Sequence, residues 1–352
     1  MFLFLAPVAI GTNENSPTTQ LGPGKSWDPK HSQVFVVGVL NWKSGSLESF
    51  TAKNRRDAQL LQAFINAGVP KEQTKYLSDS NATLPAIFSA LRASLKNCGP
   101  NDTYVFYYCG HGWLDEKGKG YFANYDVGAS NKECLSVDKI VKEFDTYFKG
   151  SQAIFLADCC RSGVIADALK SSKFKYAVLT AATSEQDSTS NWTFTQSVVD
   201  AINGHCYADK NKDGKITFDE LGKYCTDEMK VIEGQNATFS CGNTFDPALI
   251  VADVKSKAET TPKRVAVKYD GAWWLAKLLE TKNGKGKVHW LEIGWDAPSD
   301  DEWVDLSTVK SIEQKASTEQ KQLKKGDKVL VLSEGRYYDS VIRKVDKDKY
   351  FI

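Results

Sequence analysis

The chain has 352 residues, of which 41% are hydrophobic and 25% are charged, a composition typical of globular proteins. This composition excludes a mostly disordered chain, a collagen-like fibre and a disulfide miniprotein, and the length predicts two or three domains. Lys and Arg number 45 and Asp and Glu 44, so the net charge is +1 and predicts no bulk attraction to nucleic acid or anionic lipid.

The N-terminal residues have the composition of a leader. Residues 1–11 are apolar and end in Ala-Ile-Gly, which suits a signal-peptidase site, but they lack the basic start of a secretory signal. They are either a signal remnant of an exported protein or an apolar tail, in which case the cytoplasm is slightly favoured. Because residues 12–32 are rich in turn-forming residues, we expect residues 1–32 to be a disordered leader. No apolar run is long enough for a membrane-spanning helix.

Strands and helices alternate from about residue 33 to 254. Residues 34–41 form a continuous apolar run, as expected of a strand buried on both faces of a parallel sheet. Residues 54–68 carry apolar positions at helical spacing and end at a glycine. The alternation continues, with strands predicted at 75–77, 103–109, 153–157 and 176–181, and helices at 84–95, 136–148, 164–171 and 193–203. This order predicts an α/β sandwich with a mostly parallel sheet.

Two turns within this domain carry the residues of a thiol nucleophile and its base. His111 follows the strand predicted at 103–109, and Cys160 follows the strand predicted at 153–157. Ligands bind at the carboxyl ends of strands in an open parallel sheet, so we expect both side chains to face one crevice. A thiol becomes a good nucleophile beside a base, and the same His can then protonate a leaving amine. The neighbouring glycines allow backbone N–H groups to approach a developing oxyanion.

The motif His-Gly after an apolar strand, followed by Asp-x-Cys-x-Ser-Gly, resembles the caspase–metacaspase group of cysteine peptidases. The His and Cys lie 49 residues apart, close to the spacing of the caspase signature. The resemblance covers roughly residues 33–254 and implies a caspase-like three-layer sandwich that cleaves proteins or peptides. It implies Cys160 as nucleophile, His111 as general base and acid, and the backbone of Gly112 and Cys160 as oxyanion hole. Arg161 stands where metacaspases commonly have His.

Asp158 is the candidate for primary specificity. In the family that this chain resembles, the residue two before the nucleophile lines the primary pocket, and metacaspase-like enzymes with Asp there accept Arg or Lys. A buried carboxylate pairs with a cation and repels an acid, so we expect cleavage after Arg or Lys. The alternative is that Asp158 caps a turn or a helix start. Asp126 is a weaker candidate for a second acid of the pocket.

Residues 209–220 fit the twelve-residue calcium loop of an EF-hand at each diagnostic position. The loop has Gly214 at the sharp turn, and the expected Ca²⁺ ligands are Asp209, Asn211, Asp213, the carbonyl of Lys215, and Glu220. EF-hands that sense calcium usually act in pairs, and this chain has one loop. The alternative is a calcium-free turn that keeps the same shape by local hydrogen bonds.

Beyond a linker at residues 255–263, an internal repeat indicates small β modules. Residues 265–274 match residues 329–338 at an offset of 64, each copy reading strand, Gly turn, and a strand that opens with paired aromatics. The copies resemble SH3-like or Tudor-like barrels at 264–312 and, incomplete, at 325–352. An aromatic surface there would bind a Pro-rich peptide or a modified lysine, whereas the alternative places the rings in the barrel core. The rings concerned are Trp273, Trp274, Trp290, Trp295 and Trp303.

The eight cysteines show no zinc-ligand spacing, and they are buried thiols or, in an exported protein, form one or two disulfides. The leading hypothesis is thus a cysteine endopeptidase with a basic-residue preference and possible calcium modulation. One alternative is a catalytically silent scaffold that acts through its β-barrel modules. The other is a legumain-like peptidase with a different primary specificity.

Overall fold

The computed structural model describes residues 24–52, 55–128, 130–189, 191–255, 263–269, 271–290, 301–311, 324–326, 328–333, 336–346 and 349–351. The chain divides into two compact units, which we describe separately. The N-terminal unit contains the described residues up to 255, and the C-terminal unit contains those from 263 onward.

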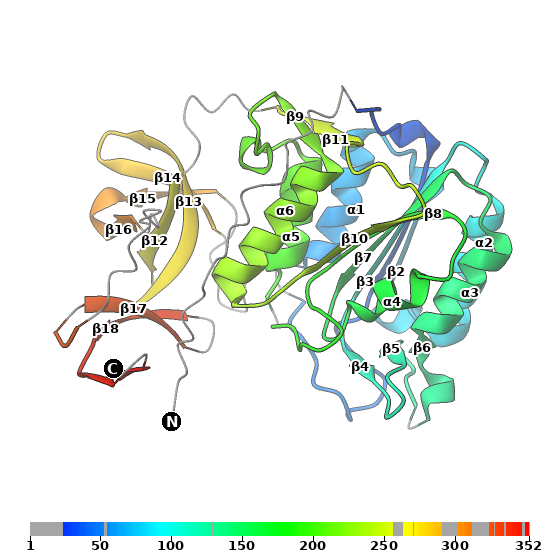
Figure 1. The fold of residues 1–352 in the computed structure, drawn as a ribbon, viewed down its shortest axis with the longest axis horizontal. Coiled ribbons are helices and arrows are strands. Elements are labelled where there is room, and N and C mark those ends of the chain that lie inside the picture. The colour runs from blue at the N-terminus through cyan, green and yellow to red at the C-terminus, as the bar shows by residue number, and fades with distance from the viewer. Residues whose placement is uncertain are drawn as a thin grey trace. The chain divides into compact units, whose positions relative to one another are not determined.

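The N-terminal unit is built on a six-stranded sheet with the strand order β10-β8-β7-β3-β1-β2 (Figure 1). Five strands are parallel and the edge strand β10 is antiparallel. Every residue of β1 and β3 is buried, which explains why their sequences are apolar without alternation. The bounds are β1 (Ser32–Gly38), β2 (Thr74–Ser78), β3 (Thr103–Cys109), β7 (Gln152–Asp158), β8 (Lys175–Thr180) and β10 (Thr238–Gly242). The prediction of a mostly parallel α/β sheet is confirmed.

Helices cover both faces of this sheet. One face carries α1 (Arg56–Ala67), α5 (Thr193–Ile202) and α6 (Phe218–Glu228), and the other carries α2 (Leu84–Lys96), α3 (Val137–Tyr147) and α4 (Val164–Leu169) (Figure 1). The helix α1 ends as predicted at Gly68, whose φ of 114° is left-handed and suits a residue without a Cβ. The result is a three-layer α/β arrangement that fits a caspase-like fold.

Aromatic side chains fill the layer between the sheet and α2–α4. Phe144 of α3 lies 4.6 Å from Phe155 of β7 between ring centroids, and both are fully buried. Tyr108 of β3 stacks on Phe122 at 4.3 Å. A fully buried aromatic side chain contributes about 1.5–3 kcal/mol. This core therefore fixes β3 and β7, the two strands that precede the predicted catalytic turns.

Several short elements of this unit carry no clear signal in the sequence. The strands β4 (Gly112–Leu114), β5 (Gly120–Phe122) and β6 (Leu135–Ser136) form a small antiparallel sheet directly after His111. The strands β9 (Lys215–Thr217) and β11 (Ile250–Asp253) form a two-stranded ribbon. The remaining turns are the 3₁₀ helices η1 (Pro29–His31), η2 (Lys71–Gln73), η3 (Asp79–Asn81), η4 (Asn131–Glu133) and η5 (Cys206–Ala208), and the π-helix η6 (Met229–Glu233).

The predicted disordered leader is wrong for residues 24–32. Trp27 packs edge-on against Phe64 of α1, with ring centroids 5.8 Å apart, and its backbone N–H donates to the carbonyl of Ile250. The Asp28 side chain caps the start of η1 by accepting from the backbone N–H of Lys30. Packing of the half-buried Trp27 ring against Phe64 outweighs the turn-rich composition of this segment. Residues 1–23 lie outside the described residues.

The C-terminal unit is an antiparallel β structure. Its main sheet has the order β15-β14-β13-β12-β16, and β18 joins β13 where Trp273 pairs with Tyr337. These two residues are equivalent positions of the internal repeat. The sheet is compatible with a small β-barrel. The bounds are β12 (Lys263–Tyr269), β13 (Ala272–Lys282), β14 (Lys285–Trp290), β15 (Glu302–Asp305), η7 (Leu306–Thr308), β16 (Val309–Ser311), β17 (Lys328–Ser333), β18 (Arg336–Val341), β19 (Lys344–Asp346) and β20 (Lys349–Phe351).

Most of the described tryptophans of this unit are buried. Trp273, Trp274 and Trp290 are at most 6% exposed, whereas Trp303 is 40% exposed. The ammonium of Lys310 lies 4.0 Å from the ring centroid of Trp273, so one face of that ring already carries a cation. These positions favour core packing over a ligand surface for three of the rings. Trp295 lies outside the described residues.

All eight cysteines lie in the described part of the chain, and all are free thiols. Cys206 and Cys241 are at least partly exposed, whereas Cys225 is buried. Within the described residues, no helix combines the length and the apolar character that crossing a membrane requires.

Candidate active site

The two predicted catalytic turns lie side by side at the carboxyl ends of β3 and β7. These strands are parallel neighbours, and their last paired residues are Cys109 and Asp158. His111 and Cys160 each follow that pair by two residues, and both line the same open cleft. The topology therefore brings together the His and Cys that the sequence singles out.

Glycine is required where the two turns approach each other. A Cβ at Gly112 would lie 2.4 Å from the carbonyl oxygen of Cys160 and 3.0 Å from the sulfur of Cys159. Gly110 has a φ of 144°, and a Cβ there would lie 2.7 Å from the carbonyl oxygen of Val39. The turn that carries His111 thus contacts the turn that carries Cys160 closely, because Gly112 has no side chain.

His111 is oriented by the segment that follows β1. Its Nε2 lies 2.8 Å from the carbonyl oxygen of Glu48, which only accepts, so Nε2 carries the proton. The other ring nitrogen, Nδ1, is then the one left for the predicted base. The ring lies between Trp42 and Phe50, at centroid distances of 4.7 and 4.6 Å. These contacts fix both the plane and the tautomer of the predicted base.

Cys160 is held by the segment between β8 and α5. The backbone N–H of Ser188 donates to its sulfur at 3.2 Å, and the thiol donates to the carbonyl of Ser188 at 3.6 Å. Burial raises the pKa of the Cys160 thiol above its ordinary value, and the Ser188 N–H acts in the opposite direction. Among the described residues no hydrogen bond joins Cys160 to His111. Burial favours the thiol form of Cys160, so the predicted nucleophilic attack would require a base.

The segment between β8 and α5 also makes hydrogen bonds and an ion pair with the turn that carries Cys160. Arg161 donates its backbone N–H to Gln186 at 2.9 Å, and its guanidinium pairs with Asp187 at 3.0 Å. Ser162 exchanges hydrogen bonds with Ala182. Arg161 has a φ of 57°, a left-handed conformation that non-glycine residues seldom adopt. The turn that carries Cys160 is thus held in place by residues 182–188.

Asp158 is a buried carboxylate in the wall of the cleft. One of its oxygens accepts from the N–H of Thr195 at 3.3 Å and from its hydroxyl at 2.5 Å, in the first turn of α5. Burial raises the pKa of Asp158 to about 7, against the lowering effect of the Thr195 bonds. Asp158 therefore combines the two predicted alternatives, because it binds the start of a helix and faces the cleft. No cationic side chain of the described residues pairs with it.

A second buried carboxylate nearby is paired with a cation. Asp57 of α1 binds the guanidinium of Arg55 at 2.8 Å and accepts from the hydroxyl of Tyr76 at 2.9 Å. The Arg55 guanidinium also binds Asp79 and the carbonyl of Gly38. Asp57 is thus compensated by a cation within the protein, whereas Asp158 has no cationic partner among the described residues.

The candidate second acid, Asp126, lies elsewhere. Its carboxylate accepts from the N–H of Leu84 at 2.7 Å and from the amide of Asn124 at 2.9 Å, so it serves the start of α2 and is absent from the cleft lining. The carboxylate that acts on Asp158 is Glu233, which helps to raise the pKa of Asp158. Glu233 accepts from the amide of Asn191, a residue of the cleft, at 3.1 Å. Nothing in the sequence near Glu233 marks it as part of this site.

The EF-hand-like loop is folded on its own hydrogen bonds. Asp209 accepts from the N–H groups of Lys212 and Gly214, at 2.7 and 2.9 Å. Glu220 accepts from the N–H groups of residues 210, 211 and 217, and it completes the capping box of α6. In the described part of the chain no three His, Cys, Asp or Glu side chains converge as a metal cluster. Yet Asp209 and Glu220 are both buried carboxylates of one loop, which suits a hard cation.

Asn211 and Asp213, two further predicted ligands, also accept from backbone N–H groups of the loop. The Asn211 side-chain oxygen accepts from the N–H of Asp213 at 2.8 Å, and the Asp213 carboxylate accepts from the N–H of Lys215 at 2.9 Å. The strand β9, which contains Lys215, pairs with β11 of the same unit. The loop is thus joined through β9 to the strand β11.

Comparisons with known proteins agree with the motif. A family model described as "Metacaspase, peptidase C14 domain" matches residues 56–169, a span that includes both predicted catalytic residues. This match supports a caspase-type cysteine peptidase in general. The solved structure of protein GSU0716 from Geobacter sulfurreducens is similar at 13% identity with a TM-score of 0.49, covering 64% of this chain and 99% of that chain. A search of curated proteins gives no match.

Proposed function

We propose that the protein is a cysteine endopeptidase in which Cys160 is the nucleophile and His111 is the general base and acid. The observation that carries this proposal is that both residues line one cleft, on adjacent glycine turns, together with the uncompensated carboxylate of Asp158. The match to the metacaspase peptidase domain supports it.

The proposed reaction begins with proton transfer from the Cys160 thiol to Nδ1 of His111. The thiolate then attacks the scissile carbonyl carbon, a C–S bond forms, and the carbonyl π-electron pair moves to oxygen. The backbone N–H groups of Gly112 and Cys160 are the proposed donors to this oxyanion. His111 next protonates the amine nitrogen, the C–N bond breaks, and the amine leaves the acyl-enzyme. The same ring then deprotonates a water molecule, which attacks the acyl carbon. The C–S bond breaks, and His111 returns the proton to the sulfur.

We propose that the cleaved bond follows Arg or Lys. A buried carboxylate without a partner favours a cationic side chain and repels an acidic one. Asp158 is the carboxylate of this kind in the cleft, since Asp57 is already bound to Arg55. Glu233 lies close enough to raise the pKa of Asp158, and it adds negative potential at the same wall.

The test is hydrolysis of matched fluorogenic peptides that end in Arg, Lys, Asp or Asn. We expect cleavage after Arg and Lys, which is lost in Cys160→Ala and in His111→Ala. Asp158→Asn should reduce cleavage after Arg and Lys without lowering the rate at which iodoacetamide labels Cys160. Cleavage after Asn alone would support the legumain-like alternative. A folded protein that cleaves none of the peptides and shows no selective labelling of Cys160 would support the silent scaffold.

We further propose that residues 209–220 bind Ca²⁺. The ligands would be the side chains of Asp209, Asn211, Asp213 and Glu220 and the carbonyl of Lys215. The burial of Asp209 and Glu220 supports the proposal, because a bound cation would compensate charges that are now met only by N–H and O–H donors. When bound, the ion would tie the loop, β9 and the start of α6 together.

Calcium binding is tested by thermal unfolding and isothermal calorimetry with and without Ca²⁺. We expect Ca²⁺ to raise the Tm, and Glu220→Gln to remove this increase while it retains the capping box, which accepts Gln as well as Glu. Equal Tm values with and without the ion, together with no heat of binding, would contradict the proposal. Peptidase rates measured in parallel would show whether the ion modulates activity.

For the C-terminal unit we propose an SH3-like or Tudor-like binding module. The antiparallel strand order and the 3₁₀ turn η7 between β15 and β16 support it. The exposed ring of Trp303 is the strongest candidate for ligand contact. Fluorescence titration with Pro-rich and methyl-lysine peptides, with Trp303→Ala as the comparison, tests this proposal.

A further inference from the structure

We propose that the backbone N–H of Ser188 stabilises the thiolate of Cys160 and is therefore a catalytic group of this site. The inference rests on the proposed role of Cys160 as the nucleophile. It adds a donor from the segment between β8 and α5, which the sequence motif around Cys160 does not include. The donor is a main-chain group, so its function does not depend on the Ser side chain.

The geometry favours the charged form of the sulfur once the base has taken the proton. The Ser188 nitrogen lies 3.2 Å from the sulfur, a short distance for a contact between N–H and a neutral sulfur. The thiol proton in turn faces the Ser188 carbonyl at 3.6 Å. Proton transfer to His111 removes this second, longer contact and strengthens the first. One residue therefore holds the thiol in place at rest and its thiolate during attack.

The segment that presents this N–H is itself well held. The side-chain carbonyl of Gln186 accepts from the backbone of Asn236 at 3.2 Å, and the Gln186 main chain binds Arg161. Asp187, between Gln186 and Ser188, pairs with the Arg161 guanidinium. The donor is thus positioned before any substrate binds, as stabilisation of a developing charge requires.

Several other groups act on the charge of Cys160. The Arg161 guanidinium favours the thiolate and the Asp187 carboxylate opposes it, and the two form an ion pair with each other. Opposite charges this close largely cancel at the sulfur. Two main-chain donors then favour the thiolate, the N–H of Ser188 with the larger effect and that of Cys160 itself. The remaining titratable groups near the thiol are Tyr108, Cys159, Asp158 and His111.

The experiment compares the pH profile of Cys160 alkylation in two backbone esters of the full chain. Replacing Ser188 by its α-hydroxy acid analogue exchanges one N–H for oxygen and keeps the side chain. The matched control is the same exchange at Glu185, whose N–H donates to the Thr183 hydroxyl in the same segment. A hydrogen bond to a charged group is stronger than one to a neutral group. We therefore expect the Ser188 ester to raise the alkylation midpoint by about one to two pH units, and the control to leave it unchanged.

A second measurement does not depend on the modified backbone. In the unmodified protein, the ¹⁵N–¹H resonance of Ser188 should move with the same midpoint as Cys160 alkylation, and this titration should vanish in Cys160→Ala. A Ser188 resonance that does not move over that range, or equal midpoints in both esters, would overturn the inference. Neither readout uses peptide cleavage. If the Ser188 amide titrates as expected but the protein cleaves no peptide, the result would count against the proposed function and not against the role of Ser188.

Discussion

The contact between the two catalytic turns leaves no room for a side chain at Gly112. We predict that Gly112→Ala lowers kcat/KM by about 100-fold or more, because the added Cβ would lie 2.4 Å from the carbonyl of Cys160 and must separate His111 from the nucleophile. Gly45→Ala is the control, since a Cβ there meets no atom within 4 Å. Kinetics on an Arg peptide check the prediction, with circular dichroism to verify folding. Equal rates for both variants would contradict close packing of the turns.

The pKa of Asp158, raised to about 7, predicts a pH-dependent preference for cationic substrates. The folded protein holds this proton more tightly than the unfolded chain does, so the group's contribution to stability is present below about pH 4 and is lost as the pH rises through about 7. Under the proposed function, Asp158 becomes neutral as the pH falls below about 7, and a cationic substrate side chain would then lose its partner. Above that pH the carboxylate is available to the substrate.

We therefore predict that the ratio of kcat/KM for an Arg peptide to that for its citrulline analogue rises with pH up to about 7 and then levels off. Because both peptides share the thiol and His titrations, those effects cancel in the ratio. In Asp158→Asn the ratio should be low and independent of pH. A wild-type ratio that is flat from pH 5 to pH 9 would argue against Asp158 as the group that binds the cation.

At the scale of elements, the segment between β1 and α1 orients the base through an ion network. Asp79 of η3 accepts from the N–H groups of Leu40 and Asn41, at 2.8 and 3.3 Å, and its own φ is 43°. Its carboxylate also binds Arg55. The chain that leaves β1 is thereby directed toward the cleft, where it presents the Glu48 carbonyl, Trp42 and Phe50 to His111.

Asp79 is thus a positioning residue, and we predict that Asp79→Ala lowers kcat by about 10-fold while KM changes little. Asp79→Asn should retain most of the rate, because an amide oxygen still accepts from both N–H groups. A merely structural role would lower the Tm of both variants in step with their kcat. Positioning of His111 predicts that the kcat of Asp79→Ala falls by more than the loss of folded protein explains, and that Asp79→Asn restores it. Similar kcat losses in the two variants would indicate that the Arg55 ion pair, and not the loop contact, matters.

The sequence predicts the elements of the parallel sheet and the pairing of the two turns, because buried strands are continuous apolar runs and their ends carry polar motifs. It does not predict what holds His111 and Cys160. Both are bound by backbone groups, those of Glu48 and Ser188, and a main-chain N–H or C=O has no side-chain signature. Glu233 contacts Asn191, and Arg55 contacts Asp79, each across more than twenty residues of sequence. The roles of His111, Cys160 and the calcium loop remain predictions that the experiments above test.

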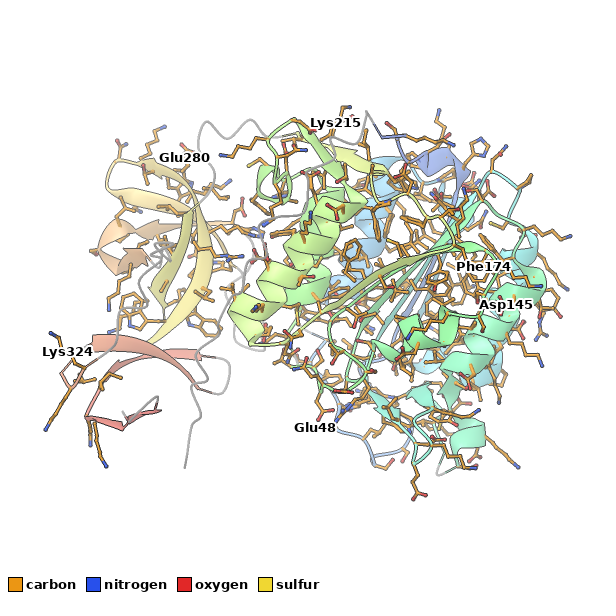
Figure 2. All side chains as sticks on the ribbon, in the orientation of Figure 1. Glu48, Asp145, Phe174, Lys215, Glu280 and Lys324 are labelled. Carbon is orange, nitrogen blue, oxygen red and sulfur yellow. The ribbon has the colours of Figure 1, made fainter. Side chains whose placement is uncertain are left out.

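At the scale of the whole molecule, the candidate catalytic machinery is confined to one unit. All six strands of the central sheet, the helices on its two faces and the lining of the cleft belong to residues 24–255. The strands of the C-terminal unit pair only with one another among the described residues. Figure 2 shows that side chains fill the space between the sheet and its helices throughout the N-terminal unit. This unit thus has the hydrophobic core that independent folding requires.

We predict that a chain limited to residues 24–255 folds and keeps the peptide preference and the Cys160 alkylation rate of the full protein, within about twofold. The physical reason is that no described group bound to His111, Cys160 or Asp158 lies beyond residue 255. The C-terminal unit should then affect cleavage of large proteins that it binds, and leave short peptides unaffected. Parallel assays of a short Arg peptide and a folded protein substrate, on both chains, separate these effects. A truncated chain that is folded but fails on the short peptide would show that the C-terminal unit takes part in forming the catalytic site.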